Sequence, residues 1–194
     1  VMENSPHVMM IGDGAEKFAK EQGIELVLPK YFWTKARWDS LQQIIKEEKA
    51  KTKQVSEFRN PVSPNERYGT VGAVALDKNG DLVAGTSTGG MTYKKYGRVG
   101  DAPIIGAGTY ADNQTCGVSA TGWGEYFIRL GIARDISAIV EYKGVSIQEA
   151  VDTVIQKKLQ NLGGDGGVIA LDKNGNIGIS FNSDGMYRAY IDEN

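Results

Sequence analysis

The sequence predicts an α/β protein whose strands form a layered sheet sandwich with helices on the outside. Runs with the apolar pattern of strands occur in pairs, and runs with helical periodicity are grouped around them. The run VGAVAL at 71–76 is apolar at successive positions, which is typical of a strand in a sheet covered on both faces. Along the chain we expect helices, a linker, two pairs of strands, two helices and a last pair of strands.

The composition limits the classes of function. The 194 residues, 41% of them hydrophobic and 24% charged, are ordinary for one domain or two small ones. A formal net charge of −2 gives no basic field for nucleic acid, and no apolar run approaches the roughly 20 residues of a membrane span. We therefore expect neither nucleic acid nor a membrane as a partner.

The rare residue types carry information about compartment and metal. Cys116 is the only cysteine, which excludes an internal disulfide and fits a reducing compartment, so we expect a cytoplasmic protein. His7 is the only histidine, which argues against a zinc site built from Cys and His. The chain starts at Val1, which is unlike a natural start, and we expect an N-terminal portion to be missing.

Three regions are predicted from the change in composition. Residues 1–45 read as helical, with one helix starting near Pro6 and a second around Trp38–Glu47. Residues 46–69 form a Lys- and Glu-rich linker with too few apolar side chains to form a core. Residues 70–194 carry the strands and the candidate site. A linker that runs straight into a core strand suggests that the bond at this junction is cut.

Two hairpins with similar sequences frame the last region. The strands Thr70–Leu76 and Asp81–Thr88 are joined by a turn containing Asn-Gly, which supplies positive φ angles. Residues 167–186 align without a gap onto residues 72–91, which indicates an internal repeat. The alternative is chance, because Asp-x-Asn-Gly is a common turn.

Between the hairpins the sequence predicts short strands and two helices. The strands are expected at Ile104–Ala107 and Cys116–Ala120. A helix is predicted from Gly122 to about Tyr142. A capping box at Ser146–Glu149 predicts another helix, which should extend to about Leu159.

The nucleophile predicted from the residues is Thr70. A serine or cysteine nucleophile would need a histidine base, but His7 lies before the linker, and Cys116 reads as a small buried side chain within a strand. A threonine made N-terminal by cleavage after Gly69 carries its own base, since its α-amino group has a pKa of about 7.7–8.0. The alternative is that Thr70 is an ordinary strand residue.

Other polar residues could complete a site around it. Thr88 ends the partner strand, and Thr121 with the backbone N–H of Gly122 could form an oxyanion hole. Arg98 could bind an α-carboxylate and Asp101 an α-ammonium group. The alternatives are that Thr121 caps a helix and that Arg98 and Asp101 form a surface ion pair.

A glycine-rich segment at 106–111 matches the G-x-G-x-x-A pattern of dinucleotide-binding proteins. The segment Asp112–Gln114 follows it in place of a helix, so we interpret it as a turn.

The motifs together resemble the plant-type L-asparaginase and isoaspartyl aminopeptidase family of N-terminal-nucleophile hydrolases. The resemblance covers almost the whole chain apart from the linker, and is most specific in the second half. It is carried by GTVGAVALD (69–77), TSTGGMT (86–92), GRVGD (97–101), GAGTYAD (106–112), ATGWGEYFIR (120–129), SPHVMMIGDGAEKF (5–18) and GMYRA (185–189), the last like the family's closing strand.

The resemblance implies a four-layer αββα sandwich and self-cleavage between Gly69 and Thr70. Residues 1–45 would then be the C-terminal part of an α-subunit, and 70–194 a β-subunit. The implied activity is hydrolysis of L-asparagine and β-aspartyl (isoaspartyl) dipeptides, small molecules from which L-aspartate is released. A dimer of αβ heterodimers is implied.

The resemblance also implies roles for individual residues. Thr70 would be the nucleophile and Thr88 would orient or activate it. Thr121 and Gly122 would form the oxyanion hole. The residues implied to contact substrate are Arg98, at the α-carboxylate, Asp101, at the α-amine, and Gly124.

The chain departs from the family pattern in two places. The N-terminal strands and the sodium-binding loop of the family are absent from it, so we expect no cofactor here and a structural sodium site only in the missing part. Trp123 is bulkier than the small residue expected between the glycines of TGWG.

Two alternative functions remain open. One is a glycosylasparaginase-like hydrolase, although such enzymes usually carry Asp where this chain has Gly69. The other is a truncated, non-catalytic remnant of the family.

Overall fold

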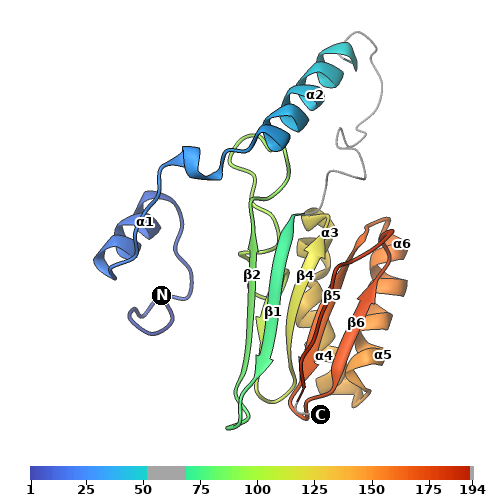
Figure 1. Cartoon of the computed structure of the whole chain (residues 1–194). Helices are drawn as coiled ribbons and strands as arrows, with labels where there is room; N and C mark the ends of the chain where they lie inside the picture. The colour runs from blue at the N-terminus through green and yellow to red at the C-terminus, as the bar shows by residue number, and fades with distance from the viewer. Residues whose placement is uncertain (52–68, 193–194) are drawn as a thin grey trace. The chain divides into compact units, whose positions relative to one another are not determined.

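The computed structural model describes residues 1–51 and 69–192, which form two units, Val1–Gln43 and Ile44–Asn194 (Figure 1). The first unit contains helix α1 (Gly12–Glu21), the short 3-10 helix η1 (Pro29–Phe32) and the beginning of α2 (Lys35–Lys51). The helix start predicted near Pro6 is wrong, because α1 begins at Gly12. Helix α2 extends past residue 46, where the linker is predicted to begin, and residues 52–68 lie outside the described residues.

The first predicted hairpin is confirmed. Strands β1 (Thr70–Leu76) and β2 (Leu82–Thr88) pair antiparallel and form a two-stranded sheet. The carboxylate of Asp77 closes the turn by accepting hydrogen bonds from the backbone N–H groups of Asn79 and Asp81, both at 2.8 Å. Such Asx turns satisfy the backbone where the ladder ends.

A second, four-stranded sheet has the antiparallel order β3-β4-β5-β6, with strands at Thr109–Ala111, Cys116–Gly122, Gly166–Asp172 and Ile177–Phe181. The strand predicted at Ile104–Ala107 is wrong: that segment is a turn, and the strand begins at Thr109.

The repeated hairpin forms β5 and β6. The carboxylate of Asp172 accepts from the N–H groups of Asn174 and Asn176, as that of Asp77 does in the first hairpin. The two hairpins therefore share their turn chemistry but lie in different sheets. Residues 185–189, expected to resemble a closing strand, do not form a strand.

The two sheets pack face to face, and strands β1 and β2 contact β4 (Figure 1). Glycines allow this close approach, since a Cβ at Gly72 would collide with the hydroxyl of Ser119. The opposite face of β1 and β2 is exposed at Val71 (71%) and Val83 (57%). The prediction of a sheet covered on both faces therefore holds, within the described residues, for one face of this sheet.

Helices cover the outer face of the four-stranded sheet (Figure 1). The helix predicted from Gly122 to Tyr142 is two helices, α3 (Gly124–Leu130) and α4 (Ile132–Lys143), because Gly131 adopts a left-handed φ of 58°. The predicted N-cap at Ser146 is confirmed by the hydrogen bond from the N–H of Glu149 to Ser146 Oγ at 3.2 Å. The helix after it continues as α5 (Ile147–Asp152), a π-helical segment η3 (Thr153–Leu159) and α6 (Gln160–Leu162).

The hydrophobic core lies between these helices and the four-stranded sheet. It contains fully buried side chains from β4, α3, α4, α5, η3 and β5, among them Val118, Phe127, Ile136, Val151, Ile155 and Val168. This core fixes the ends of β4 and the beginning of α3, where candidate residues of the site lie.

Candidate active site

Thr70 is the first residue of β1 and pairs directly with Thr88, the last residue of β2. The hydroxyl of Thr88 accepts a hydrogen bond from the N–H of Gly90 at 3.0 Å and donates one to the carbonyl oxygen of Gly69 at 3.3 Å. The carbonyl that precedes Thr70 is therefore contacted by an oriented hydroxyl group. A hydrogen bond of this kind draws electron density from the carbonyl carbon and favours attack on it.

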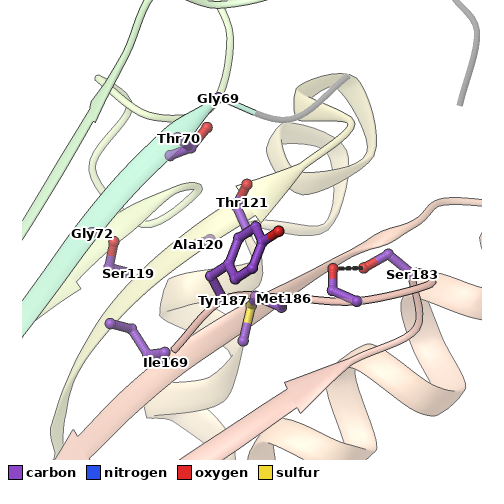
Figure 2. A pocket seen from close by; sticks show the side chains of 11 residues that line it. Gly69, Thr70, Gly72, Ser119, Ala120, Thr121, Ile169, Ser183, Met186 and Tyr187 are labelled. Atoms are coloured by element: carbon purple, nitrogen blue, oxygen red, sulfur yellow. Dashed lines mark hydrogen bonds between the residues drawn. The ribbon is translucent and has the colours of Figure 1, made fainter. Parts of the chain in front are cut away.

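Two cavities meet at Thr70. One, of about 340 Å³, is lined by Thr70, Ser119, Thr121 and Tyr187 (Figure 2). The other has a volume of about 280 Å³. Its lining includes Thr70, Thr88, Lys94, Arg98, Asp101, Gly122 and Trp123. The predicted nucleophile thus shares a cavity with both predicted binders of a charged substrate.

Arg98 is held by a carboxylate that the sequence analysis missed. Its Nε and Nη2 donate to the two carboxylate oxygens of Glu125 at 2.8 and 2.7 Å, a bidentate pair. This pair raises the pKa of Arg98 and lowers that of Glu125. Glu125 lies in the first turn of α3, next to Gly124. Its position directly after a predicted site residue could have indicated it in the sequence.

Asp101 is buried next to this pair, with an exposed fraction of 8%. Burial raises the pKa of its carboxyl group, and the charge of Arg98 opposes that rise. Arg98 supplies only part of the positive charge that balances this buried carboxylate. An ammonium group of a ligand in the adjacent cavity would supply the rest, so Asp101 is suited to bind one.

Gly124 is required by the packing of these charged groups. A Cβ at this position would lie 2.7 Å from Asp101 Oδ1 and 2.9 Å from Arg98 Nη2. Any side chain would therefore displace one of the two groups. The structure thus places Gly124 in contact with the residues that are predicted to bind substrate.

Thr121 and Gly122 end strand β4, where they pair with Gly167 and Gly166 of β5. Thr121 lines the first cavity and Gly122 the second, on either side of Thr70. Gly122 has a φ of 155°, and a Cβ there would lie 2.5 Å from the carbonyl oxygen of Asp165. Thr121 is not a helix cap, because α3 begins two residues later than Gly122 and its N-cap is Trp123.

Hydroxyl groups connect the two sheets behind Thr70. Thr86 Oγ1 lies 2.6 Å from Ser119 Oγ and also accepts a hydrogen bond from the hydroxyl of Thr109. Ser119 and Thr86 were not identified as functional by the sequence. Ser119 lies two residues before Thr121 on β4, and Thr86 lies two residues before Thr88 on β2. Residues two apart on a strand point to the same face, and this pattern in the sequence could have indicated them.

The remaining candidate residues do not join the site. Cys116 is fully buried in the core, and burial raises the pKa of its thiol to about 11, so it is not a nucleophile at neutral pH. The first half of the glycine-rich segment, residues 106–108, is a turn, closed by a hydrogen bond from the N–H of Gly106 to the carbonyl of Thr109 at 2.8 Å. Its second half is strand β3 rather than a helix.

Within residues 1–51 and 69–192, no group of three or more His, Cys, Asp or Glu side chains could hold a metal ion. In the same part of the chain, no helix is both long and apolar enough to cross a membrane.

Comparison with known proteins gives a consistent result. A family model described as Asparaginase matches residues 1–194. The isoaspartyl peptidase of Escherichia coli (strain K12) is 50% identical over 190 residues, which cover 98% of this chain and 58% of the relative. A putative isoaspartyl peptidase/L-asparaginase of Dictyostelium discoideum is 44% identical over 215 residues, covering 98% and 62%.

A plant-type L-asparaginase of Pyrococcus furiosus is 41% identical over 196 residues, covering 100% of this chain and 63% of the relative. The chain thus spans about three fifths of the length of these curated relatives.

Proposed function

The chain belongs to the Asparaginase family, and on this premise we propose that it is an autoprocessing hydrolase with an N-terminal threonine nucleophile. Its proposed substrates are L-asparagine and β-aspartyl dipeptides, from which it releases L-aspartate. The relatives' names, isoaspartyl peptidase and L-asparaginase, support this choice. The observation that carries the proposal is that Thr70, Arg98 and Asp101 line one cavity.

The first proposed step is cleavage of the chain itself. The hydroxyl of Thr70 attacks the carbonyl carbon of Gly69, its proton passes to the departing nitrogen, and an ester replaces the peptide bond. Water then hydrolyses the ester and leaves a carboxylate on Gly69 and a free amine on Thr70. The hydrogen bond from Thr88 to the Gly69 carbonyl supports this step.

Substrate turnover then uses the amine that cleavage created. The amine accepts the proton of the Thr70 hydroxyl, which attacks the side-chain carbonyl of the substrate. Thr121 and the N–H of Gly122 stabilise the oxyanion. Ammonia or an amino acid leaves with a proton from the threonine ammonium group, and water hydrolyses the resulting ester to L-aspartate.

The charged residues orient the substrate in this proposal. Arg98 binds the α-carboxylate through donors that Glu125 leaves unused, and Asp101 binds the α-ammonium group. Gly124 leaves space for both side chains. Thr88 keeps the threonine hydroxyl in position.

The finer architecture and the assembly belong to the same proposal. We infer a four-layer αββα sandwich, in which helices would cover the exposed face of β1 and β2. The proposal also includes a dimer of αβ heterodimers and a cytoplasmic location. It further includes a structural sodium ion held by a segment not in this chain.

The direct test is turnover by matched variants. Release of aspartate from L-asparagine and from β-Asp-Leu should fall at least about 1,000-fold in Thr70→Ala, because both the nucleophile and the cleavage that frees its amine are lost. Ser183→Ala changes a hydroxyl that lines the adjacent cavity and that, among the described residues, bonds only to the carbonyl of Gly185, and the variant should keep the activity. Equal activity in Thr70→Ala would refute the nucleophile, and an inactive wild type would favour a non-catalytic remnant.

A further inference from the structure

Lys94 gives the candidate cavity a positive charge that the proposed chemistry has not used. The cavity that contains Thr70 is lined by three charged side chains, Lys94, Arg98 and Asp101. Arg98 is already paired with Glu125, and Asp101 supplies a second negative charge beside it, whereas Lys94 forms no ion pair with another described residue. The α-carboxylate and the ammonium group of L-asparagine are assigned to Arg98 and Asp101, so L-asparagine has no charged group left for Lys94.

A β-aspartyl dipeptide has one more carboxylate than L-asparagine. It carries the ammonium and α-carboxylate of its aspartyl residue and, on the far side of the scissile carbonyl, the C-terminal carboxylate of the leaving residue. Its net charge is therefore −1. If Asp101 and Arg98 hold the aspartyl end, the second carboxylate is left to face the rest of the cavity wall.

Contacts place the charged lining residues in two groups. Arg98 lies against Gly100 and, together with Asp101, against Gly124, whereas Lys94 contacts Gly89 and Gly90. Thr70 lines the cavity together with both. With the scissile carbonyl assigned to Thr70 and the aspartyl end to the first group, the group around Lys94 is left for the leaving residue.

The Lys94 side chain is anchored by its own surroundings. Its Nζ donates to the carbonyl oxygen of Gly89 at 2.8 Å. The end of its stem lies over Gly90, where a Cβ would be 3.6 Å from Nζ and from Cδ and 3.7 Å from Cε. Gly90 has a φ of 75°. An ammonium group has three donors, so Lys94 can keep the bond to Gly89 and still bind a carboxylate.

We propose that Lys94 binds the C-terminal carboxylate of the leaving residue and so favours β-aspartyl dipeptides over L-asparagine. This inference rests on the proposed function, because it takes the positions of the aspartyl end and of the scissile carbonyl from it. Lys94 acts as a specificity-determining residue that contacts substrate and takes no part in bond cleavage.

The test compares substrates with and without the second carboxylate. In the wild-type protein, kcat/KM for β-Asp-Leu should exceed that for β-Asp-leucinamide by roughly 5-fold, as expected for an exposed ion pair. In Lys94→Met this ratio should fall to about 1, while kcat/KM for L-asparagine changes less than twofold. Lys94→Arg, which keeps the charge, should keep most of the preference.

Each other outcome overturns the proposal. An equal loss for all three substrates in Lys94→Met would mean that Lys94 only holds the Gly89 carbonyl. An unchanged ratio would mean that another group binds the carboxylate.

Binding separates this inference from the proposed function. Calorimetry of the cleaved wild-type protein uses a β-Asp-Leu analogue in which a methylene group replaces the scissile nitrogen, so that it is not hydrolysed. This acid should bind more tightly than its C-terminal amide, and Lys94→Met should show no difference. Binding with this preference but no turnover by the wild type would refute the proposed hydrolase and leave the inference standing. Absence of binding, or the same affinity for acid and amide, would overturn the inference itself.

Discussion

At the scale of single residues, the side chain of Thr88 has a role that can be separated from that of its neighbours. It hydrogen-bonds the carbonyl of Gly69, next to the bond proposed to be cut. Ser87 precedes it on β2, pairs with Val71 and is exposed. Thr88 therefore has its hydroxyl at the site, and Ser87 has a hydroxyl at the neighbouring position of the same strand that can serve as a control.

Removing the Thr88 hydroxyl should slow cleavage of the chain. In Thr88→Ala we expect the rate of splitting at Gly69–Thr70 to fall about 10- to 100-fold, because a donor to the attacked carbonyl is lost. Gel electrophoresis of a time course after expression measures this rate. Ser87→Ala should split as the wild type does, and equal rates in both variants would contradict the role of Thr88.

Asp101 should contribute to binding at a cost in stability. Burial raises its pKa in the folded protein, so the ionised form is disfavoured by folding at neutral pH, and this cost disappears as pH falls through the folded-state pKa. In Asp101→Asn we expect kcat/KM to fall at least about 100-fold, because the ammonium group of the substrate loses its countercharge. The Tm at pH 7 should be equal to or above that of the wild type.

Steady-state kinetics and thermal unfolding on the same sample test both parts. A variant that is both inactive and markedly less stable would indicate that Asp101 mainly supports its own loop. The backbone carbonyl of Asp101, which accepts hydrogen bonds from the N–H groups of Ile104 and Gly108, is unchanged by the substitution.

At the scale of elements, helix α3 fixes the end of strand β4. The ring of Phe127 is fully buried, and a Cβ added to Gly122 or to its partner Gly166 would lie 2.5 or 2.7 Å from it. The ring thus packs against a pair of residues that have no side chains. This contact joins the core to the proposed oxyanion donor at Gly122.

Truncation of this ring should therefore affect stability and catalysis together. Phe127→Ala should lower the free energy of unfolding by about 3–5 kcal/mol, as expected for a large cavity in a packed core. Phe127→Leu should restore most of the stability but leave kcat reduced, since a smaller side chain holds Gly122 less firmly. Urea denaturation with activity measurements tests this, and full activity in Phe127→Leu would separate α3 from the oxyanion donor.

At the scale of the whole molecule, cleavage should determine how activity depends on pH. Only the cleaved chain has an amine at Thr70, with an expected pKa of about 7.7–8.0. The deprotonated amine is the proposed base, so kcat/KM should rise as pH increases from 6 to about 9 and then level off. A profile that is flat across this range, measured with β-Asp-Leu, would exclude this amine as the base.

The sequence predicts the strands of the molecule better than it predicts the loops and the contacts between side chains that are distant in the sequence. The hairpin with Asp77 is predicted correctly because its turn chemistry is a local property, whereas the covering of both its faces is not local and holds for one face only. The break at Gly131 was missed because helical periodicity continues across it, and only the left-handed backbone ends the helix. The turn at 104–107 was mistaken for a strand because a short apolar run is ambiguous.

The candidate site shows the same division. The chemistry of the residues and the family resemblance predict Thr70, Thr88, Arg98, Asp101, Thr121 and Gly122 as site residues, and the structure places them in the lining of two adjoining cavities. Glu125 and Lys94 were missed because a charged residue is ordinary at an exposed position. Only tertiary structure shows Glu125 bonded to Arg98 and Lys94 lining the cavity.

The proposed mechanism depends on one event, the release of the Thr70 amine by cleavage after Gly69. Intact mass spectrometry of the denatured protein, with N-terminal sequencing of the smaller species on a gel, tests it most directly. We predict two polypeptides, one of which begins with Thr-Val-Gly-Ala, and a single uncut chain in Thr70→Ala. A wild-type preparation that hydrolyses β-Asp-Leu while it remains one uncut chain would contradict the account.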